Sequence, residues 1–158
     1  MNLRISVLSL LIGFAVPAWA QHTAPPGADP NASFQPLPER KDVVSWKTLA
    51  QVELVKQKDR YVPQFSSSIA ALDKKDVKLQ GFMMPLEMGE KQSHFVLAAM
   101  PTTCAFCMPG GPESMVEVKM KTPVKYSFDA LVVSGKLTVL KDDPSGIFYR
   151  ITDAEPAK

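Results

Sequence analysis

Two cysteines separated by two residues are the feature of this sequence with the clearest chemical potential. Cys104 and Cys107 lie in the stretch TTCAFCMPGGP (102–112), and they are the only cysteines in the 158 residues. Two thiols at this spacing can form a disulfide, exchange disulfides with a substrate or bind a metal ion. The residues around the two cysteines must therefore indicate which of these three functions applies.

Metal binding is the hypothesis that the residue types favour. Cys104 and Cys107 with a glycine three residues later resemble one half of a zinc knuckle, and His94, just before the loop, is the expected third ligand. Met100 and Met108 add thioethers, which together with thiolates favour Cu(I). The sequence therefore predicts a site for Zn or Cu(I) at these five residues.

Two other interpretations of the cysteine loop remain open. A Cys104–Cys107 disulfide would contribute only about 2 kcal/mol by chain entropy, so it would stiffen its own loop more than the domain. A thioredoxin-like enzyme places the motif at the start of a helix, but Pro and Gly residues follow Cys107 directly and disfavour a helix. A stiffened loop would form a surface for a partner protein, made of Phe106, Met108, Pro109, Gly110, Gly111 and Pro112.

Composition and motifs argue against most other functions. The sequence contains no G-x-S-x-G motif, no Ser-His-Asp order and no glycine-rich phosphate loop, so we expect a protein without catalytic activity. Its 18 basic and 16 acidic residues are interspersed and form no basic stripe. Nucleic acid is therefore not an expected partner.

The first forty residues predict export. Residues 1–20 combine Arg4, a short apolar run and an Ala-Trp-Ala end, which is the pattern of a cleaved signal peptide. The apolar run is too short to span a membrane, so we expect a periplasmic mature form without a membrane span. Residues 21–40 are rich in proline and predict a flexible tail.

Residues 41–153 are expected to form a single domain, followed by a short tail over 154–158. Helical spacing predicts helices over 45–56 and 63–73. Alternation then predicts five strands, at 77–84, 93–100, 115–121, 129–140 and 147–154. Gly81 and Gly135 in the middle of two strands indicate the coiling of a small barrel. The expected fold is α+β, with two N-terminal helices packed on a five-stranded antiparallel, OB-like, partly open barrel.

The stretches VKLQGFMMPLE (77–87) and SHFVLAA (93–99), followed by a cysteine-containing loop, resemble an exported bacterial family of unknown function, DUF3299. The most specific matching residues are Gly81, Phe82, Met83, Met84, Pro85, Leu86 and Glu87. The resemblance implies an OB-like periplasmic protein that accompanies ABC-type export or metal-homeostasis systems. It thus implies a periplasmic or inner-membrane transport protein as the partner, and it assigns no catalytic activity.

Overall fold

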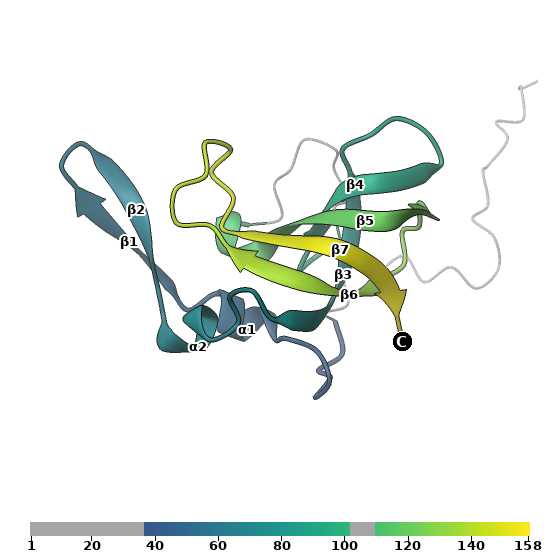
Figure 1. Ribbon diagram of the computed structural model, residues 1–158, viewed down its shortest axis with the longest axis horizontal. Coiled ribbons are helices and arrows are strands. Elements are labelled where there is room, and N and C mark those ends of the chain that lie inside the picture. Colours follow the sequence, from purple (N-terminus) through teal and green to yellow (C-terminus); the bar gives the residue numbers. More distant parts are fainter. Residues whose placement is uncertain (1–36, 102–109) are drawn as a thin grey trace, which may run out of the picture.

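The computed structural model describes residues 37–101 and 110–158 (Figure 1). The expected signal peptide and most of the expected tail lie outside these residues. The same is true of the cysteine motif and of part of the expected docking loop, namely Cys104, Phe106, Cys107, Met108 and Pro109.

Five strands form a closed barrel. They are β3 (Asp76–Pro85), β4 (Lys91–Ala98), β5 (Met115–Lys125), β6 (Leu131–Val139) and β7 (Tyr149–Ala157). Around the barrel the order is β3-β4-β5-β7-β6, and β6 pairs again with β3. The five strands predicted by alternation are confirmed, with ends shifted by a few residues.

Two details of the predicted barrel are wrong. The barrel is closed instead of partly open, and it is mixed instead of antiparallel because β7 runs parallel to β5. The parallel pair arises because β6 pairs with β3 and not with β5, and the chain then returns through residues 140–148 to place β7 between β6 and β5. β7 also continues to Ala157, beyond the expected end of the domain at 153.

Two glycines allow the strands to approach closely enough for closure. A Cβ atom at Gly81 would lie 2.7 Å from both the Ala98 carbonyl oxygen and the Leu97 side chain. Gly81 is the last β3 residue paired with β6, and the following residue pairs with β4. A Cβ atom at Gly135 would lie 2.7 Å from the Thr152 carbonyl oxygen. These contacts explain why both coiled strands require glycine.

The first predicted helix is wrong beyond its first turn. The chain forms one helical turn, α1 (Trp46–Leu49), and then enters β1 (Val52–Gln57) instead of continuing to residue 56 as a helix. Ser45 does cap α1, as expected, since its side chain accepts a hydrogen bond from the Lys47 N–H at 3.2 Å.

A hairpin takes the place of the rest of that helix. β1 pairs antiparallel with β2 (Arg60–Phe65), and the hairpin projects from the barrel (Figure 1). The β-branched pair Val55–Val62 favours this pairing over a helix. The second helix is shorter than the predicted range 63–73. Its first residues belong to β2, and only α2 (Ser67–Ala70) is helical.

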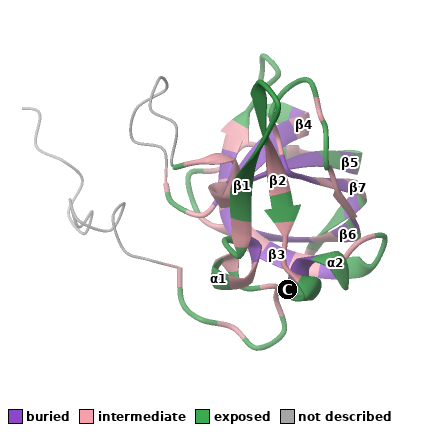
Figure 2. Cartoon of the chain, turned by 90° about the vertical axis from the view of Figure 1, so that its left-hand side faces the viewer, coloured by how far each residue is buried: buried purple, intermediate pink, exposed green. Residues whose placement is uncertain are grey.

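The helical turns close one end of the barrel core. Leu49 of α1 and Ile69 of α2 are fully buried in the same cluster as the inward residues of the strands. The buried Tyr149 hydroxyl donates a 2.6 Å hydrogen bond to the Leu49 carbonyl, which fixes α1 to the barrel. Figure 2 shows buried residues along the barrel strands and exposed residues along the hairpin. None of the helices within residues 37–101 and 110–158 is long and apolar enough to cross a membrane.

Candidate functional site

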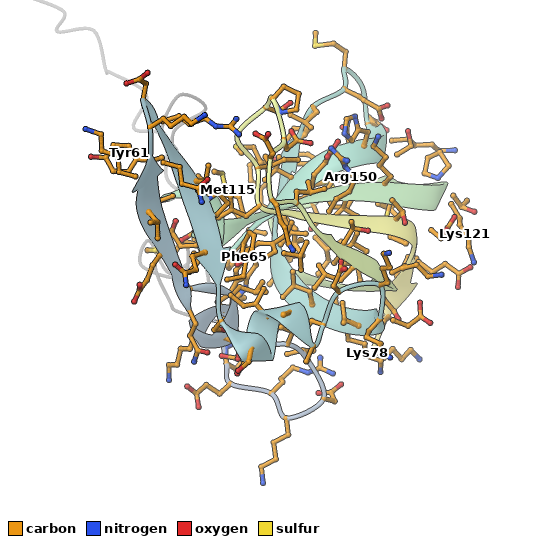
Figure 3. The ribbon with its side chains drawn as sticks, turned by 60° about the vertical axis from the view of Figure 1, so that its left-hand side comes forward. Tyr61, Phe65, Lys78, Met115, Lys121 and Arg150 are labelled. Carbon is orange, nitrogen blue, oxygen red and sulfur yellow. The ribbon has the colours of Figure 1, made fainter. Side chains whose placement is uncertain are left out.

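A chain of four paired side chains crosses the outer face of the barrel. His94 Nε2 lies 2.7 Å from Glu117 Oε1, and the second oxygen of Glu117 accepts a hydrogen bond from Arg150 Nε. Arg150 Nη2 in turn donates to Asp143 Oδ2 at 3.2 Å. Figure 3 shows Arg150 extending from the barrel strands. We call these four residues the His94–Asp143 network.

Strand register places these residues together. His94 pairs with Lys119 on β5, so Glu117 lies diagonally across from it on the same face of the sheet. Glu117 pairs directly with Arg150 across the parallel β5–β7 ladder. Inward-pointing Val116 and Val118 flank Glu117, and alternation therefore directs the carboxylate outward. Asp143 comes from the loop between β6 and β7.

The electrostatics of the network hold its carboxylates in the ionised form. Burial alone would raise the pKa of Glu117, but hydrogen bonds from Arg150 and His94 outweigh burial and lower that pKa. Hydrogen bonding to Glu117 raises the pKa of Arg150. The Ser145 backbone N–H, aided by Arg150, lowers the pKa of Asp143. The guanidinium is therefore held between two carboxylates.

The network orients His94. An ionised carboxylate only accepts hydrogen bonds, so Nε2 of His94 carries the hydrogen that points at Glu117. Nδ1 is then the ring nitrogen left for another partner: it has no hydrogen bond among the described residues, and the His94 side chain is 37% exposed. A histidine that donates one ring N–H to a carboxylate while its other nitrogen is free has the usual arrangement of a metal ligand.

Glu87, the last residue of the motif that resembles the family, has a structural role beside His94. Its carboxylate accepts hydrogen bonds from the Ser93 N–H at 2.8 Å and the His94 N–H at 3.2 Å. It also accepts from the Ser93 hydroxyl at 3.0 Å, and these bonds lower the pKa of Glu87. Glu87 thus ties the β3–β4 loop to the start of β4 and fixes the backbone of His94.

The structure does not bring all the predicted ligands together. His94 lies in the middle of β4, four residues before Ala98, which corresponds to about 13 Å of extended strand. Met100 lies beyond that end of β4, where it contacts a groove also lined by Trp46. In the two described ranges no three His, Cys, Asp or Glu side chains gather closely enough to hold a metal ion.

The other motif residues serve the barrel. Met83 is buried in the core, as alternation predicts, and Phe82, Met84 and Pro85 pair with β4. Leu86 is exposed in the loop after β3. Of the expected docking loop, Gly110, Gly111 and Pro112 are described. Gly111 precedes the short 3-10 turn η2 (Pro112–Ser114), and its carbonyl accepts a hydrogen bond from the Ser114 N–H.

Sequence reasoning missed the partners of His94. Asp143 has a local role in its turn, where its carboxylate accepts a hydrogen bond from the Ser145 N–H at 2.9 Å. Its second role depends on Arg150, which lies on a strand whose parallel neighbour the sequence does not reveal. The available signal was Glu117, an acidic residue between two inward valines on a predicted strand.

A model of the DUF3299 family, described as a protein of unknown function, matches residues 20–150. Among solved structures, the chain is similar to a DUF3299 family protein from Pseudomonas aeruginosa PAO1. The similarity covers 61% of this chain and 68% of that one, with 23% sequence identity and a TM-score of 0.49. No curated protein matches this chain.

Proposed function

Because the chain belongs to the DUF3299 family, whose function is unknown, we propose a function from its own residues. We infer a non-enzymatic periplasmic accessory protein that binds a transition metal ion and serves a membrane transport system. We also propose that the closed mixed barrel is of OB type, because its strand order β3-β4-β5-β7-β6 has the last strand inserted between the third and the fourth.

The observation that carries this proposal is the orientation of His94. Glu117 holds Nε2 at 2.7 Å, which leaves Nδ1 as a preformed ligand on the strand that leads into the cysteine loop. Cys104 and Cys107 supply the thiolates by their spacing in the sequence. Two thiolates and one imidazole leave a fourth position open, which suits an ion that is passed on to a transporter.

Zinc is the favoured ion. Zinc binds imidazole and thiolate together, whereas Cu(I) favours thioethers with thiolates. Met100 contacts the groove beyond the end of β4 instead of the surroundings of His94. A site built on His94 therefore does not include Met100, and the Cu(I) alternative requires a different set of ligands.

The test is a titration of the reduced full-length protein with Zn²⁺ and with Cu(I), followed by native mass spectrometry. We expect one Zn²⁺ per chain, and loss of binding in Cys104→Ser/Cys107→Ser. His94→Gln should weaken binding, whereas His22→Gln, the matched control at the second histidine of the chain, should not. Stoichiometric zinc binding that persists in the double serine variant would refute the thiolate site.

A second candidate function is a partner-binding module whose loop is locked by a Cys104–Cys107 disulfide. The observation in its favour is that the Ala99 N–H donates to the Ser114 carbonyl at 3.1 Å, which joins the two ends of the loop. Thiol titration of protein taken directly from the periplasm distinguishes the candidates. Absence of free thiols, with no zinc uptake after mild reduction, favours the docking module.

A further inference from the structure

A groove of about 700 Å³ lies at the end of β4, between residues 37–47 and the barrel. This volume falls in the range of ordinary ligand sites. Its apolar walls are formed by Leu37, Pro38, Val43, Trp46, Met100 and Pro101. Met100 is 56% exposed, which is a large fraction for an apolar residue. The groove therefore presents apolar surface that another apolar group can cover.

The indole of Trp46 is a fixed wall of this groove. Its Nε1 donates a 2.8 Å hydrogen bond to the backbone carbonyl of Gln80 on β3, and the ring packs against the barrel core. Aromatic rings pack favourably against one another, and methionine sulfur makes favourable contacts with aromatic rings. A fixed indole and an exposed thioether in one groove therefore suit an aromatic side chain as the occupant.

The N-terminal segment of the chain joins the described residues at this groove. Leu37 is the first described residue, and it already lines the groove. Among residues 21–36, which lie outside the described part, Phe34 has the only large apolar side chain. Consecutive Cα atoms are about 3.8 Å apart, so the Cα atom of Phe34 is at most about 11 Å from that of Leu37. The aromatic ring nearest in sequence to the groove is thus tethered within its reach.

The short tether favours Phe34 over an occupant from another molecule. A group held by a short linker has an effective concentration in the millimolar range, so even weak contacts are occupied. Pro36 and Pro38 flank Leu37, and their fixed φ angles reduce the entropy that the segment loses when it becomes ordered. The match to the family model begins at residue 20, so this segment belongs to the region that the family model covers.

We propose that Phe34 of this same chain binds in the groove, against Trp46 and Met100. Met100 and Pro101 directly precede the cysteine motif, so the bound ring covers the point where the chain leaves β4 for that motif. A partner protein that contacts this surface has to displace Phe34 first. The proposal does not depend on metal binding.

Oxidation of Met100 by hydrogen peroxide reports whether the groove is covered, because exposed methionines form the sulfoxide more readily than covered ones. Met88, which is 100% exposed, is the reference in the same molecule, and Met83, which is 4% exposed, reports the integrity of the core. The sulfoxide at each residue is measured in the full-length protein by fragment-ion mass spectrometry. Exposures of 56% and 100% explain a difference of only about twofold between Met100 and Met88. Stronger protection of Met100 requires a group that covers it.

Phe34→Ala should accelerate Met100 oxidation relative to Met88 by roughly tenfold, which the burial of one phenylalanine side chain can supply. Met83 should stay protected, because Phe34 lies outside the strands that form the core. Gln35→Ala, at the neighbouring position, is the matched control and should leave Met100 as in the wild type. An excess of a peptide with the sequence of residues 30–36, PNASFQP, should restore the protection of Met100 in Phe34→Ala.

Three outcomes would overturn the proposal. The first is equal oxidation of Met100 in the wild type and Phe34→Ala, which would mean that the ring does not cover it. The second is an equal effect of Gln35→Ala, which would mean that the aromatic ring is not the group that binds. The third is loss of protection on dilution, which would assign the groove to a second copy of the chain, because binding within one chain does not depend on concentration.

Discussion

Replacing Glu117 by glutamine should destabilise the protein by about 2 kcal/mol at neutral pH. The substitution preserves the shape of the side chain and removes the charge that Arg150 and His94 share. Removing one partner of a fully buried ion pair costs about 3–5 kcal/mol. Here the Arg150 and His94 side chains are 27% and 37% exposed, so both can regain water. Arg150 also keeps its hydrogen bond to Asp143. The solvent exposure and this remaining partner bring the expected cost below that range, to about 2 kcal/mol.

The pH dependence of this loss of stability shows whether the charge of Glu117 is its cause. The pKa of Glu117 is lower in the folded protein than in the unfolded chain, so ionised Glu117 stabilises the fold above the unfolded value of about 4.3. That contribution is lost as the pH falls from there through the folded pKa. The stability difference between wild type and Glu117→Gln should therefore be largest at pH 7 and shrink towards about pH 3. Carboxylates outside the His94–Asp143 network titrate in both proteins and cancel in the difference.

The assay is urea denaturation at both pH values, followed by circular dichroism. Glu155→Gln removes one partner of the exposed pair between Lys121 and Glu155, and it should leave the midpoint unchanged. An equal loss of stability at both pH values would mean that glutamine disturbs packing and not charge. No loss at pH 7 would mean that the His94–Asp143 network does not contribute to the fold.

Three further changes test the scaffold. Gly81→Ala should cost about 1–3 kcal/mol in urea denaturation, because its Cβ would lie 2.7 Å from a carbonyl oxygen of β4, and wild-type stability would contradict the close approach. Tyr149→Phe should cost about 1–2 kcal/mol by leaving the Leu49 carbonyl without its donor, and an unchanged midpoint would show that water replaces it. Glu87→Gln should speed hydrogen exchange at the Ser93 amide while exchange in β6 stays constant, and equal acceleration in both places would indicate global destabilisation instead.

The five barrel strands could be predicted from their apolar patterns: buried and more exposed residues alternate along β3, and β4 ends in a run of four buried residues. In β5, Val116 and Val118 point inward on either side of Glu117. Gly81 and Gly135 indicated the coiling that closure needs. Neither signal specifies which strands become neighbours. The parallel β5–β7 pair depends on the path of residues 126–130, which takes β6 to β3 and leaves the place beside β5 to β7, and local sequence does not encode that path.

The hairpin shows the limit of periodicity in short segments. Residues 46–55 satisfy helical spacing over more than two turns, and Val52 and Leu54, on either side of Glu53, also alternate as in a strand. Pairing with β2 decides between the two, because Val55 then lies opposite Val62. The sequence did contain a signal for this turn: the polar stretch at 57–60 separates two apolar runs by a hairpin length.

The stretch GFMMPLE (81–87), on which the sequence resemblance to the family was based, builds the corner between β3 and β4. Gly81 permits the close approach of the two strands, Met83 fills the core and Glu87 fixes the loop. Gly81 has no side chain, Met83 is buried and the Glu87 carboxylate is occupied by its hydrogen bonds, so these three residues are not available to bind a ligand. His94 lies on β4, one of the two strands that this corner joins, and among the described residues its Nδ1 has no hydrogen-bond partner. Metal binding therefore has to be tested at His94 in this chain itself.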